Sequence, residues 1–315
     1  MEGLLLFLAG LLSLGAIYGI VCLALNLEAG VDGLWDLGIV SFFGIGAYTY
    51  VLLTAAHGES YHEHVLAFGM PMWVGVIGAA LAGAAVAWLI GLPSLRLRRE
   101  YFLITTLAFA EVIRQIYTNE TWLTNGVKGI YGLEQPLKSL VDPTTHVYVL
   151  AVLLLLLALL AFWIVQRLTA APFGRALKAL RENEPLAMTA GLKPFSYHIR
   201  AFLVAGALSG AAGAFYVWYN TLIVPGQFGA EVTFFVWTAV IIGGLGRNLG
   251  ALLGGFILIL LYDLLRFIQV SSDLAIVLTS LRTALIGLAL VLILRLRPQG
   301  LFPERPQTVP VRRDT

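Results

Sequence analysis

Two ionisable residues stand inside an apolar run at a spacing that lets their side chains meet. Glu111 and Arg114 lie three positions apart in the run 101–118, and residues at this spacing are neighbours on one face of a helix. By the helical rise they lie about 15–20 Å along the run, where ionisable groups in a membrane are costly and by default functional. Two interpretations stay open: a structural ion pair, or a role in substrate passage or subunit contact.

Other residues that could take part in catalysis or bind a metal form no convincing site. One short tract has an H-x-H pair of the kind that chelates zinc or copper. It contains His57, Glu59, His62, Glu63 and His64. Without a second ligand group, a polar loop is the favoured interpretation. The chain has no Ser/His/Asp or Cys/His constellation, no H-E-x-x-H and no G-x-x-x-x-G-K-[ST] phosphate loop. We therefore expect no catalytic residue, no metal site and no cofactor bound by this chain.

Glycines are concentrated in two places. The first set surrounds Asp36 and consists of Gly30, Gly33, Gly38, Gly44 and Gly46. Small residues let helices approach closely in lipid, but so many also fit a broken helix whose freed backbone groups line a cavity. The second set is Gly246, Gly250 and Gly254, at i, i+4 and i+8. This spacing predicts a ridge of small residues for close helix packing.

The elements that must position these residues are membrane spans. Of the 315 residues, 59% are hydrophobic and 12% charged, and the mean hydropathy is +0.87, whereas a soluble domain has about 25% charged residues. A span needs about 20 apolar residues. Such runs lie near 4–25, 37–56, 72–92, 101–118, 147–166, 201–218, 232–246, 249–268 and 277–294. The sequence predicts an all-α polytopic membrane protein with about nine transmembrane helices, in a range of eight to ten.

The distribution of basic residues predicts the orientation, because cytoplasmic loops are enriched in Lys and Arg. The stretches 93–100, 167–200, 247–248 and 295–315 hold 15 basic residues, and the opposite loops 57–71, 119–146, 219–231 and 269–276 hold only Lys128 and Lys138. This predicts an N-out, C-in topology. Residues 1–303 are expected to form one transmembrane domain, with 304–315 as a cytoplasmic tail. The segment 26–36 does not fit this charge pattern, because the topology places it on the cytoplasmic side although it carries acidic and no basic residues. It is therefore expected to dip into the membrane.

The longest basic-side loop, 167–200, contains an amphipathic helix. Arg175, Lys178, Arg181 and Glu182 form one stripe, and Leu177 and Leu180 lie to one side of it. A helix lying on the membrane surface is one interpretation. We prefer a docking helix that contacts a partner at the cytoplasmic face.

The same loop resembles the cytoplasmic loop of ABC-importer permeases, in particular the pattern GRA-x-x-A-x-R-E-N-x-x-x-A-x-x-x-G of the branched-chain amino acid permease family. Matching positions are Gly174, Arg175, Ala176, Ala179, Arg181, Glu182, Asn183, Ala187 and Gly191. The stretches 44–49, 91–114, 123–133 and 243–255 also resemble the family, and its M-type subunit more than its H-type. Asp36, and Asn125 where glycine is usual, depart from the family pattern.

The resemblance implies a permease subunit of an ABC importer for branched-chain amino acids. Its partners would be two ABC ATPases that carry ATP and Mg, a second H-type permease, and a periplasmic or surface substrate-binding protein, with the bacterial inner membrane around it and no nucleic acid. The coupling residues would be Arg175, Lys178, Arg181, Glu182, Asn183, Glu184, Ala187 and Gly191. The candidate pathway or subunit interface would include Gly30, Gly33, Asp36, Gly38, Gly44, Glu111 and Arg114. Rivals are a permease for urea, short amides or another small polar solute, and an ion-coupled carrier.

Overall fold

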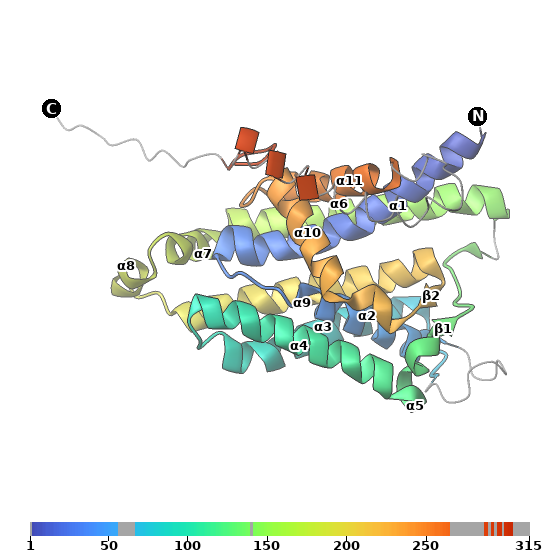
Figure 1. The fold of residues 1–315 in the computed structure, drawn as a ribbon, viewed down its shortest axis with the longest axis horizontal. Coiled ribbons are helices and arrows are strands. Elements are labelled where there is room, and N and C mark those ends of the chain that lie inside the picture. Colours follow the sequence, from blue (N-terminus) through green and yellow to red (C-terminus); the bar gives the residue numbers. More distant parts are fainter. Residues whose placement is uncertain are drawn as a thin grey trace.

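The computed structural model describes residues 2–55, 67–138, 141–264, 287–288, 291–292, 295–297 and 299–304 (Figure 1). Its helices are α1 (Glu2–Leu25), the π-helix η1 (Asn26–Asp32), α2 (Ile39–Thr54), α3 (Met72–Ser94), α4 (Arg99–Asn119), α5 (Thr121–Thr124), η2 (Gly126–Lys128), α6 (Pro143–Ala170), α7 (Pro172–Glu182), α8 (Glu184–Thr189), α9 (Pro194–Asn220), η4 (Pro225–Phe228), α10 (Ala230–Gly243) and α11 (Asn248–Leu264). Two short strands, β1 (Ile130–Tyr131) and β2 (Leu222–Ile223), pair antiparallel.

Eight of the nine predicted runs coincide with helices of the described part, namely α1, α2, α3, α4, α6, α9, α10 and α11. Four helical stretches there are long and apolar enough to cross a membrane: Gly3–Asp32, α3, α6 and α9. The helices α2, α10 and α11 are apolar but shorter. Only fragments of the ninth run, 277–294, belong to the described residues. The chain is thus an all-α, multi-pass membrane protein.

Backbone-to-backbone contact holds the central helices together. The helix α9 packs against α2 and α3, and glycines stand at the crossings. A Cβ at Gly46 or at Gly83 would collide with a backbone carbonyl of α9, that of Gly210 or Gly206. Because lipid tails are as apolar as leucine, close van der Waals packing of small residues replaces the hydrophobic effect as the attraction between such helices.

A second group of helices is built on α1, which contacts α6, α9 and α11. In Figure 1 these long helices run nearly parallel, and α4 runs along the opposite edge of the molecule. On α11, Gly250 and Gly254 face the backbone of α10 at Gly243 and Ala239. Gly246 lies before α11, in a turn with φ +84°, so it is not on the helical ridge that its spacing predicts.

Candidate functional site

The amphipathic segment forms two helices, α7 and α8, at one end of the molecule, with α8 outermost (Figure 1). Pro172 occupies the first turn of α7, where its missing N–H costs nothing. Leu177 is fully buried in a small cluster with Leu27 and Val31 of η1. The apolar face of α7 is therefore packed on the protein's own η1.

Two members of the charged stripe also face the protein. Lys178 Nζ lies 2.6 Å from Glu304 Oε1, and Arg181 Nη2 lies 2.9 Å from Glu304 Oε2. Arg181 also donates through Nη1 to the carbonyl oxygen of Gly30. Glu304 was not a predicted site residue. The sequence offers only a weak indication of its role, namely that Glu304 is the one acidic residue between Arg295 and Arg313.

The segment that carries Glu304 is itself docked on α10. The amides of Leu301 and Phe302 donate to the carbonyls of Ile242 and Gly243, at 2.9 and 3.0 Å. The guanidinium of Arg247 lies 5.8 Å from the centre of the Phe302 ring. Residues 299–304, which we call the C-terminal strap, thus connect the end of α10 to α7.

The helix α8 presents its side chains outward. Asn183 caps it, since its Oδ1 accepts from the amide of Leu186 at 3.0 Å. Ala187 is buried, whereas Leu186 and Met188 are 66% and 54% exposed. Gly191, at φ +86°, follows the helix, and a Cβ at this position would meet nothing within 4 Å. The predicted coupling residues Arg175, Glu182, Asn183 and Glu184 are all exposed.

The acidic segment between α1 and α2 is buried inside the chain. Glu28, Asp32 and Asp36 are at most 1% exposed. Asp32 Oδ1 lies 2.8 Å from Nδ1 of His198 on α9, and Asp36 Oδ1 accepts from the amide of Gly38 at 2.7 Å. The sequence predicted that this acidic segment dips into the membrane; in the structure η1, which carries Glu28 and Asp32, packs against α7 and α9.

The loop 33–38 is tied to two further helices. The indole of Trp237 on α10 donates to the Asp36 carbonyl at 2.7 Å, and its ring lies 5.5 Å from that of Trp35. The amide of Leu37 donates to Thr106 Oγ1 on α4 at 3.1 Å. This loop, in which the sequence departs from the family pattern, therefore connects η1 with α4 and α10.

The predicted pathway residues do not converge on one site. Gly30 abuts Gly246, Gly33 abuts the Arg181 stem, Gly38 abuts the Thr106 carbonyl, and Gly44 abuts Phe228. The tight contacts at these glycines agree with close packing, and the non-helical stretch 33–38 between η1 and α2 agrees with a broken helix.

Glu111 and Arg114 do form an ion pair, on an exposed face of α4. Arg114 Nη2 and Nε lie 2.5 and 2.9 Å from the two Glu111 oxygens, and Gln115 Nε2 donates to Glu111 at 2.8 Å. Tyr101, Ile104 and Val112 are exposed on the same helix. No other element of the described residues covers this face.

A polar junction lies where η1, α6 and α11 meet. The Asn248 amide nitrogen lies 2.9 Å from Gln166 Oε1 and 2.8 Å from Thr169 Oγ1, and its oxygen accepts from Asn26 at 3.0 Å. Asn26 in turn accepts from the amide of Gly246 at 2.8 Å. The buried amides of Asn26 and Asn248 thus have hydrogen-bond partners, as burial in an apolar interior requires.

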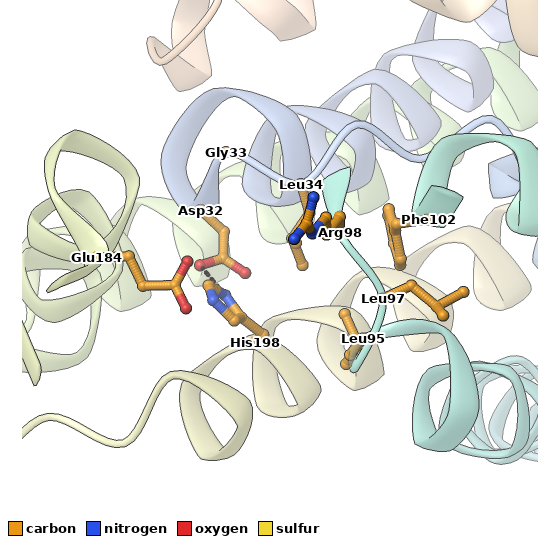
Figure 2. A pocket seen from close by; sticks show the side chains of 9 residues that line it. All are labelled: Asp32, Gly33, Leu34, Leu95, Leu97, Arg98, Phe102, Glu184 and His198. Carbon is orange, nitrogen blue, oxygen red and sulfur yellow. Dashed lines mark hydrogen bonds and ion pairs between the residues drawn. The ribbon is translucent and has the colours of Figure 1, made fainter. Parts of the chain in front are cut away.

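A cavity of about 120 Å³ opens beside α8 (Figure 2). It is lined by Asp32, Gly33, Leu34, Leu95, Leu97, Arg98, Phe102, Glu184 and His198. Figure 2 shows Glu184, Asp32 and His198 on one side, Leu97 and Phe102 on the other, and Arg98 between them. The sequence predicted only Gly33 and Glu184 of this group, and for other roles.

Metal binding has no support in the described part of the chain, where no group of three His, Cys, Asp or Glu residues is arranged to hold a metal ion. The histidine tract at 57–64 lies outside the described residues.

Asn125, where the family favours glycine, adopts φ +60° and donates to the Gly129 carbonyl at 2.6 Å. Asparagine is one of the few residues that tolerate this conformation.

Together, the bundle of apolar helices and the amphipathic helix pair at its end define a multi-pass membrane protein. The family model for the permease component of branched-chain amino acid transport systems matches residues 7–294. The chain is 32% identical over 94% of its length to the high-affinity branched-chain amino acid transport system permease protein LivM of Escherichia coli, covering 70% of that protein. It is 29% identical over 93% of its length to the probable permease LivM of Methanocaldococcus jannaschii, covering 92% of it.

The LivH permease of Salmonella typhimurium is more distant, with 23% identity over 78% of this chain and 80% of that one. No solved structure matches. The chain belongs to the branched-chain amino acid transport permease family and is of the M type, as the sequence motifs predicted.

Proposed function

We propose that this chain is the M-type permease subunit of an ATP-driven ABC importer that carries branched-chain amino acids across a bacterial inner membrane, with its N-terminus outside and its C-terminus inside. The observation that carries the proposal is the family match over residues 7–294. Relatives described as LivM and LivH belong to branched-chain amino acid systems, which supports an assembly with a second, H-type permease, two ATPases and a binding protein.

The helix α8 is the proposed contact with the ATPases. It is the outermost element at its end of the molecule (Figure 1), and Leu186 and Met188 expose apolar side chains there. Exposed apolar groups rimmed by polar residues are typical of protein interfaces. Arg175, Glu182 and Glu184 would supply the polar rim, and ATP and Mg would bind only to the partner subunits.

Movement of α8 would reach the membrane helices through α7. Because Arg181 bonds to both Gly30 and Glu304, α7 cannot rotate without pulling on η1 or on the C-terminal strap. The roles of Lys178 and Arg181 are then to transmit force within the chain, whereas the exposed residues contact the ATPase.

The exposed face of α4 is the proposed boundary of the substrate path, shared with the H-type chain. Placing an ionised side chain at the bilayer centre costs about 2.5–3.5 kcal/mol on insertion scales. The pair of Glu111 and Arg114 would therefore face a second protein chain or an aqueous path in preference to lipid.

Reconstitution tests the function. The assembly of both permeases, ATPases and binding protein in liposomes should accumulate leucine, isoleucine or valine only with ATP, and this chain alone should neither hydrolyse ATP nor concentrate them under an ion gradient. Gradient-driven uptake by the isolated chain would contradict the proposal. Accumulation of urea or an amide by the assembly, without leucine, would correct the substrate alone.

A further inference from the structure

The cavity beside α8 brings together two charged groups of opposite sign that do not pair. Arg98 and Glu184 both line it, and neither is in an ion pair within the described residues. Opposite charges that border one small space without closing on each other leave room for a ligand that carries both complementary charges.

The rest of the lining restricts that ligand further. Leu95, Leu97 and Phe102 form an apolar wall opposite the acidic side (Figure 2). The volume, about 120 Å³, is somewhat below that of an engineered cavity of roughly 150 Å³ that holds benzene, so it encloses about six non-hydrogen atoms. Because the cavity is open on one side, a small aliphatic amino acid fits with part of it at the mouth, and a large aromatic amino acid does not.

We propose that this cavity binds a small aliphatic α-amino acid in its zwitterionic form. Arg98 pairs with the carboxylate, Glu184 accepts from the ammonium group, and the aliphatic side chain contacts Leu95, Leu97 and Phe102. Asp32 stays paired with His198 at 2.8 Å and fixes the cavity floor. Both ends of the ligand then make charge-assisted hydrogen bonds. The site is therefore selective for zwitterions against molecules that carry only one charge.

The position of the cavity gives binding a regulatory consequence, and this step rests on the proposed function. Glu184 is the first residue of α8, whereas Arg98 precedes α4. An amino acid held by both would tie α8 to the loop between α3 and α4. If α8 moves when the ATPases close, ligand binding favours the unmoved arrangement and opposes transport. Imported amino acid would thus inhibit its own uptake from the cytoplasmic side.

Direct binding is the first test, with the full chain in lipid nanodiscs and radiolabelled leucine as the probe. Arg98→Gln and Glu184→Gln should each weaken binding by tenfold or more, since each removes a charge-assisted contact. The matched controls are Arg96→Gln and Glu100→Gln, exposed charges nearby that do not line the cavity; these should bind as the native chain does. Absence of saturable binding, or binding indifferent to Arg98→Gln and Glu184→Gln, overturns the proposal.

Ligand analogues test the zwitterion. Neither 4-methylpentanoate nor isopentylamine, which carry one charge each, should displace leucine at tenfold excess. Equal competition by either would overturn the assignment of two complementary contacts. If leucine fails to bind while Arg98→Gln prevents recovery of the ATPases with the chain, the cavity is a socket for an ATPase side chain, and the proposal is wrong.

The regulatory step is tested in the reconstituted assembly. Leucine on the ATPase side should slow ATP-driven uptake several-fold, and Arg98→Gln should relieve this inhibition. Uptake that ignores leucine on that side refutes the regulation and leaves the proposed function intact. Absence of uptake under every condition refutes the proposed function, while the nanodisc measurement still decides whether the cavity binds an amino acid.

Discussion

Replacing Arg181 by methionine tests whether α7 is held by its charged contacts. The change keeps the stem that packs on Gly33 and removes the guanidinium, which bonds to Glu304 and to the Gly30 carbonyl. Two variants provide comparison. Lys178→Met loses one contact, to Glu304, and Arg175→Met removes an exposed charge that makes a long 3.4 Å contact with the Ala170 carbonyl.

The expected loss follows from the exposure of each group. The Arg181 and Glu304 side chains are 24% and 28% exposed, so we assign their pair about 1 kcal/mol, the upper end for solvated ion pairs. A charged donor to the Gly30 carbonyl adds about 1.5 kcal/mol. Arg181→Met should therefore cost roughly 2–3 kcal/mol, Lys178→Met about 0.5–1 kcal/mol, and Arg175→Met close to nothing.

Thermal unfolding of the purified chain in one detergent measures these differences. At about 2–4 °C per kcal/mol, Arg181→Met should lower Tm by roughly 5–10 °C. The double variant with Glu304→Gln should lose about 1 kcal/mol less than the sum of the single losses, because the two residues share one contact. Equal effects of the Arg181 and Arg175 variants, or strict additivity with Glu304→Gln, would refute the proposed anchoring of α7.

Three further predictions concern packing, the polar junction and topology. Gly46→Leu should prevent assembly of α2 on α9 because its Cβ would meet a backbone carbonyl; size-exclusion chromatography should show aggregation, whereas Gly3→Leu, which has open space, should elute normally. Asn248→Ala should lower Tm by the equivalent of about 2–4 kcal/mol, since buried partners lose their bonds, and an unchanged Tm would contradict this. With the native cysteine replaced, Val127→Cys should react with an impermeant thiol reagent in intact cells and Leu186→Cys should not; labelling of both from outside would refute the topology.

The helices were predictable because hydropathy and length act locally. A run of about 20 apolar residues can satisfy its backbone in lipid only as a helix, so the run 147–166 predicts α6 with no knowledge of its neighbours. The stripe at 175–182 likewise predicts α7, because its charged residues and Leu177 and Leu180 occur at helical spacing. In the structure both leucines are buried, as an amphipathic helix requires.

The partners of charged residues were not predictable, because they depend on distant segments. Arg181 and Glu304 are separated by 123 positions, and no periodicity connects them. The stripe also gave no sign that Lys178 and Arg181 face the protein while Arg175 faces solvent. The cavity was missed for the same reason: Arg98, Glu184 and His198 belong to three separate segments, and only the fold brings them together.

The contacts around the loop 33–38 explain how an outer helix pair would control helices in the membrane. Arg181 joins α7 to the Gly30 carbonyl, and η1 continues directly into this loop. At the loop, the Asp36 carbonyl accepts from Trp237 of α10, and the Leu37 amide donates to Thr106 of α4. Each contact joins backbone to a side chain from another helix, so a shift of η1 changes the positions of α4 and α10 together. Because α4 carries the exposed ion pair, the face proposed to border the substrate path is connected by bonded contacts to the face proposed to meet the ATPases.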